Sequence, residues 1–160
     1  MLVSRKRWLE VLRENKSQYP LSKRWRVEEK KHDQYYIIGY NTFAIDKDRT
    51  ISGICKNPKS ELTGIDILME AISKGGNKLQ AFGEKLYEFY TENGFTPICT
   101  VKFNKKYAPK GCTKKDTLVL YYYTKRKTNL SLKQVKKILP EFNSFVKAQE
   151  YRKFIMEEKE

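Results

Sequence analysis

The chain has 160 residues, the usual size of one domain. Its 33 Lys and Arg residues outnumber its 19 Asp and Glu residues, so its formal net charge is +14. Hydrophobic residues make up 39% and aromatic residues 13% of the chain, which suffices for a core and argues against disorder along the whole length. No stretch approaches the roughly 18 consecutive apolar residues of a membrane span, so we expect no membrane segment.

Residues that could carry metal, redox or secretory functions are few. Cys55, Cys99 and Cys112 are an odd number without CxxC spacing, which predicts a reducing cytoplasm and neither a disulfide framework nor a zinc site. His32 is the only histidine, which excludes mechanisms that need several histidines. Residues 1–15 are charged throughout and contain no apolar core, so we expect no signal peptide.

Positive charge is concentrated between residues 101 and 140, where Asp116 is the only acidic residue. The cations in this stretch are Lys102, Lys105, Lys106, Lys110, Lys114, Lys115, Lys125, Arg126, Lys127, Lys133, Lys136 and Lys137. Such a cluster attracts anions, which leaves open a nucleic acid, a phosphorylated cofactor, an acidic protein or simply a solvated surface.

The chain begins with a predicted helix over residues 4–15, because Trp8, Val11 and Leu12 recur on one helical face. Ser4 is the expected N-cap of this helix.

An antiparallel meander is predicted next. Residues 24–28 alternate apolar and charged side chains, as a half-buried strand does. Residues 35–45 are rich in Tyr, Ile, Thr and Phe, and residues 50–56 follow as a further strand after a turn.

The next segment predicts a helix over residues 63–74, with Thr63 and Asp66 as a near match to a capping box. Its expected buried stripe consists of Ile65, Leu68, Met69 and Ile72. A short strand over 78–82 precedes a second helix over 83–92. We expect this second helix to bring Leu86, Phe89 and Tyr90 together.

Strands are predicted over 97–103 and 117–124, with a loop over 104–116 between them. A final helical region begins at Ser131 and is interrupted at Pro140. The element order predicts an α+β domain with a central mixed, mostly antiparallel sheet flanked by helices. We expect this domain to span residues 1–128, with residues 129–160 as a helical C-terminal extension packed on it.

Gly53 and the segment after it are the first candidate functional features. A glycine inside the apolar strand 51–55 indicates a bulge or the close approach of a ligand. Residues 56–64 lead from that strand into a helix, whose N-terminus can bind phosphate, and Lys56 and Lys59 would strengthen the attraction.

The run Phe89-Tyr90-Thr91-Glu92-Asn93-Gly94-Phe95 matches the pattern Y-x-x-x-G-F. The run begins in the predicted helix 83–92. This helix is separated by one strand from the helix over residues 63–74, whose N-terminus is the candidate phosphate site. In these features the chain resembles the GNAT-type N-acetyltransferases, and residues 75–104 are similar to small GNAT-like proteins of bacteriophages and mobile elements. The resemblance covers residues 50–123, which would be the core of a GNAT-like domain.

The resemblance implies a sheet that opens between the strands at Ile51 and Leu79, with acetyl-CoA bound there as co-substrate. It assigns the thioester oxygen to the backbone amides of Gly53 and Ile54, and the protonation of the departing thiolate to Tyr90. It places residues 60–64 at the pyrophosphate. The cofactor-binding candidates there are Ser60, Thr63 and Gly64, and Lys59 beside them would add positive charge. The acceptor amine would attack directly. Glu28, Glu29 and Asp33 lie on the substrate side, but nothing singles out one of them as the base.

These features predict a cytoplasmic enzyme, encoded by a phage or mobile element, that transfers an acetyl group from acetyl-CoA to an amine. Of the family's pyrophosphate turn, Q/R-x-x-G-x-G/A, this chain keeps only Gly64, which is followed by the bulky Ile65. This departure leaves open a second function, that of a catalytically silent GNAT-like protein that binds and inhibits an acidic host partner. The net charge and the run Tyr121, Tyr122 and Tyr123 leave open a nucleic-acid-binding protein. The apolar residues after Pro140 would allow a homodimer.

Simpler structural roles compete with these assignments. Tyr90 could be a packing residue on an apolar helix face, and Gly53 could form a bulge that only twists its strand. Gly94 fits a helix C-cap whatever the function.

Overall fold

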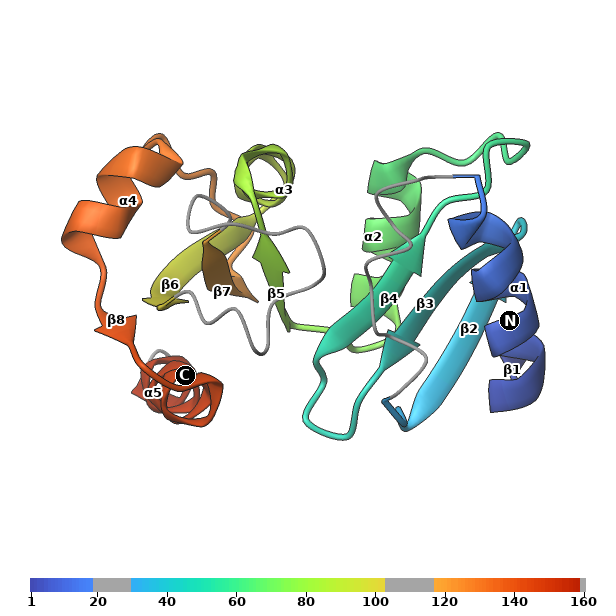
Figure 1. Cartoon of the computed structure of the whole chain (residues 1–160), viewed down its shortest axis with the longest axis horizontal. Coiled ribbons are helices and arrows are strands. Elements are labelled where there is room, and N and C mark those ends of the chain that lie inside the picture. Colours follow the sequence, from blue (N-terminus) through green and yellow to red (C-terminus); the bar gives the residue numbers. More distant parts are fainter. Residues whose placement is uncertain (19–29, 103–116, 159–160) are drawn as a thin grey trace. The chain divides into compact units, whose positions relative to one another are not determined.

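The computed structural model describes residues 1–18, 30–102 and 117–158. They group into two units, Met1–Asn77 and Lys78–Glu160. Each unit holds one four-stranded, mostly antiparallel sheet with helices, so the predicted α+β class is confirmed (Figure 1). The boundary between the units does not coincide with the expected boundary at residue 128. The strand expected at 24–28 and the whole of the loop expected at 104–116 lie outside the described residues.

The first unit combines two helices with the antiparallel sheet β1-β2-β3-β4. Its elements are β1 (Leu2–Val3), α1 (Arg5–Lys16), β2 (Gln34–Ile38), β3 (Asn41–Ile45), β4 (Ile51–Cys55) and α2 (Gly64–Ser73). The Ser4 hydroxyl accepts a hydrogen bond from the Arg7 N–H at 3.2 Å, so the predicted N-cap of α1 is confirmed.

Trp8 packs helix α1 against this sheet. Its side chain is fully buried and its Nε1–H donates to the Phe43 carbonyl at 3.0 Å. It packs in a cluster with Leu12, Tyr35 and Ala44. The apolar face predicted for the first helix is therefore the face that the sheet covers.

The strand-forming segment 35–45 holds two strands, because β2 and β3 form a hairpin there. Gly39 and Tyr40 connect them with φ angles of +51° and +69°. Positive φ at both central residues is the geometry of the tight turns that match the twist of paired strands. A Gly-Tyr pair is a weak turn signal, since tyrosine rarely adopts a positive φ.

Helix α2 has the predicted N-cap and capping box at Thr63, but a different buried face. Its buried residues are Ile67, Leu68 and Ala71, whereas Ile65 and Met69 are 47% and 45% exposed. The buried face is thus rotated by about 100°, or one residue, from the expected stripe. Ala71 has a small side chain that adds little to a hydrophobicity pattern, so the pattern does not indicate the face that is buried.

The second unit contains the sheet β5-β7-β6-β8, in which β8 is parallel to β6 and the other pairs are antiparallel. Its elements are β5 (Lys78–Phe82), α3 (Glu84–Glu92), β6 (Phe95–Val101), β7 (Leu118–Tyr123), α4 (Leu132–Ile138), β8 (Glu141–Phe142) and α5 (Phe145–Glu158). The predicted helical tail thus contains the unpredicted short strand β8.

Helices α3 and α5 cover opposite faces of this sheet (Figure 1). Tyr121 faces α3, whereas its neighbour Leu120 belongs to the cluster beneath α5, as expected for successive strand residues. On α3 the buried tyrosines are Tyr87 and Tyr90, whereas Leu86 is 37% exposed. The predicted face of this helix is therefore correct for Tyr90 and wrong for Leu86.

Arg152 joins α5 to strands β5 and β7. It is 1% exposed, and its guanidinium donates to the carbonyls of Leu79 at 2.8 Å and Tyr121 at 3.3 Å. It also donates to the Gln80 side chain at 3.2 Å. Hydrogen bonds from a charged donor to backbone carbonyls are among the stronger ones, so this buried cation fixes α5 on the sheet.

Candidate functional site

A glycine bulge interrupts strand β4. The register with β3 shifts between Thr42 and Ala44, so Gly53 and Ile54 lie opposite the single residue Phe43. Gly53 has a φ of +63°, the left-handed conformation of the glycine in one class of bulge. The Thr42 hydroxyl donates to the Gly53 carbonyl at 2.9 Å and braces the bulge. A bulge leaves its extra residue out of the strand ladder and disrupts the ladder locally.

The bulge lies on an edge strand. Among the described residues β4 is the last strand of its sheet, and β5 is the first strand of the other. In the part of the chain that the structure describes, each of these strands pairs with a neighbouring strand along one edge only.

Three asparagines fix the loop that follows β4, and their side chains were not predicted as part of the site. Asn41 is fully buried, and its Nδ2 lies 2.9 Å from the Ile38 carbonyl and 2.8 Å from the Ser60 hydroxyl. Its Oδ1 accepts from the Asn57 N–H at 2.7 Å. Asn57 in turn donates from Nδ2 to Oδ1 of the buried Asn15 at 2.9 Å. The network ties the loop to α1 and to the β2–β3 hairpin.

The loop also satisfies its own backbone donors. The Lys59 N–H donates to the Asn57 side chain at 2.8 Å and the Ser60 N–H to the Asn57 carbonyl at 3.0 Å. The Leu62 N–H donates to the Ser60 hydroxyl at 3.1 Å. The Ser60 hydroxyl, predicted to bind cofactor, is therefore an acceptor within the loop.

The start of α2 already holds an anionic group. The Thr63 N–H donates to the Asp66 carboxylate at 2.7 Å, and the Asp66 N–H donates to the Thr63 hydroxyl at 3.2 Å. The backbone hydrogen bond from Thr63, and then its hydroxyl, lower the pKa of Asp66. The Asp66 carboxylate is thus charged at neutral pH. Among the backbone N–H groups of the first turn, those of Gly64 and Ile65 take no part in this cap.

All six predicted cofactor-binding residues lie in the first unit, along β4, the loop and the start of α2. Lys59 and Thr63 are exposed, and the other four are half-buried. The structure therefore brings Ser60, Thr63 and Gly64 together around the helix N-terminus, and it places Gly53 and Ile54 at the bulge.

Tyr90 lies in the second unit and is 7% exposed. Its ring packs against those of Phe89, Phe95 and Tyr121, with centroids 5.3, 5.8 and 5.7 Å away. Burial raises the pKa of Tyr90 to about 12, so the phenol stays protonated at neutral pH. These surroundings suit a packing residue and also a proton donor, and the catalytic role of Tyr90 stays a prediction.

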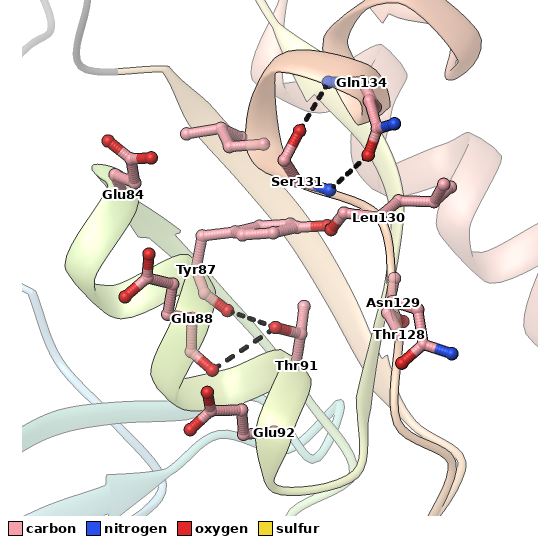
Figure 2. Close-up of a pocket in the computed structure, with 11 residues that line it drawn as sticks. Glu84, Tyr87, Glu88, Thr91, Glu92, Thr128, Asn129, Leu130, Ser131 and Gln134 are labelled. Carbon is pink, nitrogen blue, oxygen red and sulfur yellow. Dashed lines mark hydrogen bonds between the residues drawn. The ribbon is translucent and has the colours of Figure 1, made fainter.

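A separate pocket of about 250 Å³ lies between α3 and the segment before α4 (Figure 2). Glu84, Glu88 and Glu92, four residues apart on α3, line one wall. Tyr87 crosses the pocket and donates its hydroxyl to the Leu130 carbonyl at 2.6 Å (Figure 2). None of the predicted site residues lines this pocket, although the four-residue spacing of the glutamates is visible in the sequence.

The basic cluster is described only in part. Lys125, Arg126, Lys127, Lys133, Lys136 and Lys137 are all exposed in the second unit, whereas Lys105, Lys106, Lys110, Lys114 and Lys115 lie outside the described residues. Tyr121 is fully buried against α3, so it cannot stack on a base. Tyr122 and Tyr123 are half-buried, and as strand neighbours they face opposite sides.

His32 is in a loop, as expected, but its imidazole is buried with a side-chain exposure of 1%. Its Nδ1 lies 2.6 Å from the Asp46 carboxylate, and its ring packs against Trp8 and Tyr35. Of the three acids considered as bases, Asp33 is exposed, and Glu28 and Glu29 lie outside the described residues.

In the described parts of the chain, no helix is long and apolar enough to cross a membrane, and no group of three or more His, Cys, Asp or Glu side chains is arranged to hold a metal ion. Comparison of the chain with protein-family models, curated proteins and solved structures gives no match in any of the three.

Proposed function

We propose that this chain is a GNAT-type acyltransferase that moves an acetyl group from acetyl-CoA to an amine. The observation that carries the proposal is the bulge at Gly53, at the position where the resemblance requires a bulge to hold the thioester oxygen. Two further features support it. A loop follows β4 and leads into the capped helix α2, and β4 is an edge strand of its sheet among the described residues.

The proposed chemistry needs few side chains. Backbone donors at Gly53 and Ile54 would stabilise the oxyanion formed when the amine attacks, and one such donor contributes about 3–4 kcal/mol where it has been measured. Tyr90 would protonate the departing thiolate, and its raised pKa keeps the required proton on the phenol. The acceptor is a primary or secondary amine, with the base unassigned.

The cellular setting is part of the proposal. Cys55 and Cys99 are free and buried, which supports a reducing cytoplasm. The origin in a phage or mobile element rests on the resemblance of residues 75–104 alone.

Calorimetric titration with acetyl-CoA tests the proposal. We expect saturable heat with the native chain and at least about tenfold weaker binding in Gly53→Ala, because a Cβ at a φ of +63° strains the bulge. Gly75→Ala is the matched control, since Gly75 also has a positive φ but an added Cβ there meets nothing within 4 Å. No heat at high micromolar concentrations, or equal losses in both variants, would contradict donor binding at the bulge.

A catalytically silent GNAT-like protein that binds an acidic partner is the second candidate. The occupied donors of the loop and the Asp66 carboxylate at the helix N-terminus favour it, because both disfavour a phosphorylated cofactor. Absence of acetyl-CoA binding in the titration, together with a stoichiometric acidic protein retained through purification at low salt and released by high salt, would select this candidate.

A further inference from the structure

We infer that a basic surface on the second unit binds the phosphate backbone of a nucleic-acid duplex without reading its sequence. The inference goes beyond the proposed function and does not depend on it. Between residues 124 and 140 the chain carries six cationic side chains and no carboxylate. All six are exposed and form what we call the basic surface: Lys125, Arg126, Lys127, Lys133, Lys136 and Lys137.

Helix α4 presents three of these cations on one face. At about 100° per residue, Lys133, Lys136 and Lys137 fall within an arc of about 100° around the helix axis. The buried residues of α4 are Leu132 and Val135, which lie outside this arc, and a capping box closes the start of the helix. The three lysines therefore project together from a fixed helix.

The other three cations lie on the turn that follows β7. The N–H groups of Thr124 and Lys125 both donate to the Gly94 carbonyl, at 2.8 and 3.0 Å, which fixes the turn against the end of α3. Because the segment from Lys127 to Lys133 is short and partly helical, the Cα atoms of these two residues are no more than about 20 Å apart. A duplex carries one charge per about 1.7 Å of its axis, so one duplex can contact both groups of cations.

In the described part of the chain, no carboxylate neutralises the basic surface. None of its six cations forms an ion pair there, whereas Arg7 pairs with Glu10 at 3.3 Å and Lys74 pairs with Glu70 at 3.7 Å. The glutamates of α3 line the pocket between α3 and the segment before α4, and none of the three α4 lysines lines that pocket. The positive potential of the basic surface is therefore available to an external anion.

The composition of this segment favours a nucleic acid over an acidic protein. Five of the six cations are lysines, and lysine is depleted in protein–protein interfaces. Residues 124–140 also include no Trp, Tyr or Phe, and aromatic residues are the usual anchors of such interfaces. A phosphate backbone needs no such anchor, because Lys and Arg contacts supply most of the affinity.

The same lack of aromatic residues favours a duplex over a single strand. Proteins that bind single strands stack the bases on aromatic rings. The nearest aromatic residues in the sequence offer no such platform, because Tyr121 is fully buried and the half-buried Tyr122 and Tyr123 face opposite sides of β7. A duplex keeps its bases stacked on one another and presents only its charged backbone, which matches the basic surface.

Fluorescence anisotropy with a labelled DNA duplex tests the inference on the full chain. We expect a dissociation constant between about 1 and 100 μM near physiological salt, the same for duplexes of unrelated sequence. The logarithm of the binding constant should fall with the logarithm of salt concentration with a slope of about −5, as six phosphate contacts give. The triple variant Lys133→Gln, Lys136→Gln and Lys137→Gln should reduce the size of this slope by about 2–3 and weaken binding at least about tenfold.

Lys6, Arg13 and Lys47 provide the matched control, because they are exposed cations of the first unit. Their joint replacement by glutamine removes the same charge and should change the slope by less than about 1. Equal losses in the two triple variants would overturn the inference, since the net charge and not the basic surface would then bind DNA. Arginine at the three α4 positions keeps the charge and should bind DNA as the native chain does. A loss in that arginine variant as large as in the glutamine variant would also contradict the inference.

Three further probes separate a duplex from other polyanions. Poly-glutamate represents an acidic protein, phosphatidylserine vesicles represent an anionic membrane, and one strand of the duplex represents a single-stranded nucleic acid. We expect each of them to bind more than about tenfold more weakly than the duplex. Equal or tighter binding of any of the three, or no binding of the duplex at low salt, would overturn the inference. None of these results depends on acetyl-CoA, so the inference and the proposed function can fail separately.

Discussion

Replacing Tyr90 with phenylalanine is expected to lower kcat about 100-fold without changing donor affinity, because general acid catalysis typically contributes 10²–10⁴-fold. The structure gives the Tyr90 hydroxyl no hydrogen-bond partner among the described residues, while the ring packs against Phe95 and Tyr121. Phenylalanine keeps that packing, so the melting temperature should stay unchanged. Release of free thiol from acetyl-CoA, in the presence of a panel of primary amines, measures the rate.

Tyr87→Phe is the matched control, since Tyr87 lies one helical turn earlier and its hydroxyl donates to the Leu130 carbonyl. Loss of that bond should cost about 1 kcal/mol of stability and leave kcat nearly unchanged. If Tyr90→Phe retains the native kcat, Tyr90 is a packing residue and the assigned proton donor is wrong.

Asn41→Ala is expected to lower the free energy of unfolding by about 3 kcal/mol, because it leaves several buried groups without partners. The Asn57 N–H loses its acceptor at 2.7 Å, and the Ile38 carbonyl loses a donor at 2.9 Å. We also expect faster amide exchange at Lys59, whose acceptor Asn57 is no longer held. Urea unfolding and hydrogen exchange measure these two effects.

The exposed Asn129 provides the control for this change. Asn129→Ala should alter the free energy of unfolding by less than about 0.5 kcal/mol. A similarly small cost for Asn41→Ala, with native exchange rates in the loop, would show that the asparagine network does not hold the loop.

Local signals in the sequence predict most elements because they act over a few residues. Ser4 and Thr63 cap their helices as expected, since an N-cap depends only on the next three positions. The glycine in strand 51–55 likewise indicates its bulge, because few other residues adopt a φ of +63°.

Features that depend on distant partners are the ones that sequence reasoning misses. Asn15, Asn41 and Asn57 are far apart in the chain, and each alone is an ordinary polar residue, so nothing in the local pattern indicates a shared network. The buried faces of α2 and α3 depend in the same way on what the sheets present. The small Ala71 and the tyrosine Tyr87 face the core, whereas Met69 does not.

The central claim is that an acyl thioester binds at the bulge in β4, and amide NMR on the uniformly ¹⁵N-labelled chain tests it most directly. On titration with acetyl-pantetheine, the account predicts that the largest shifts occur at the Gly53 and Ile54 amides. Shifts confined to the α3 pocket around Glu88, or no shifts at all, would contradict it.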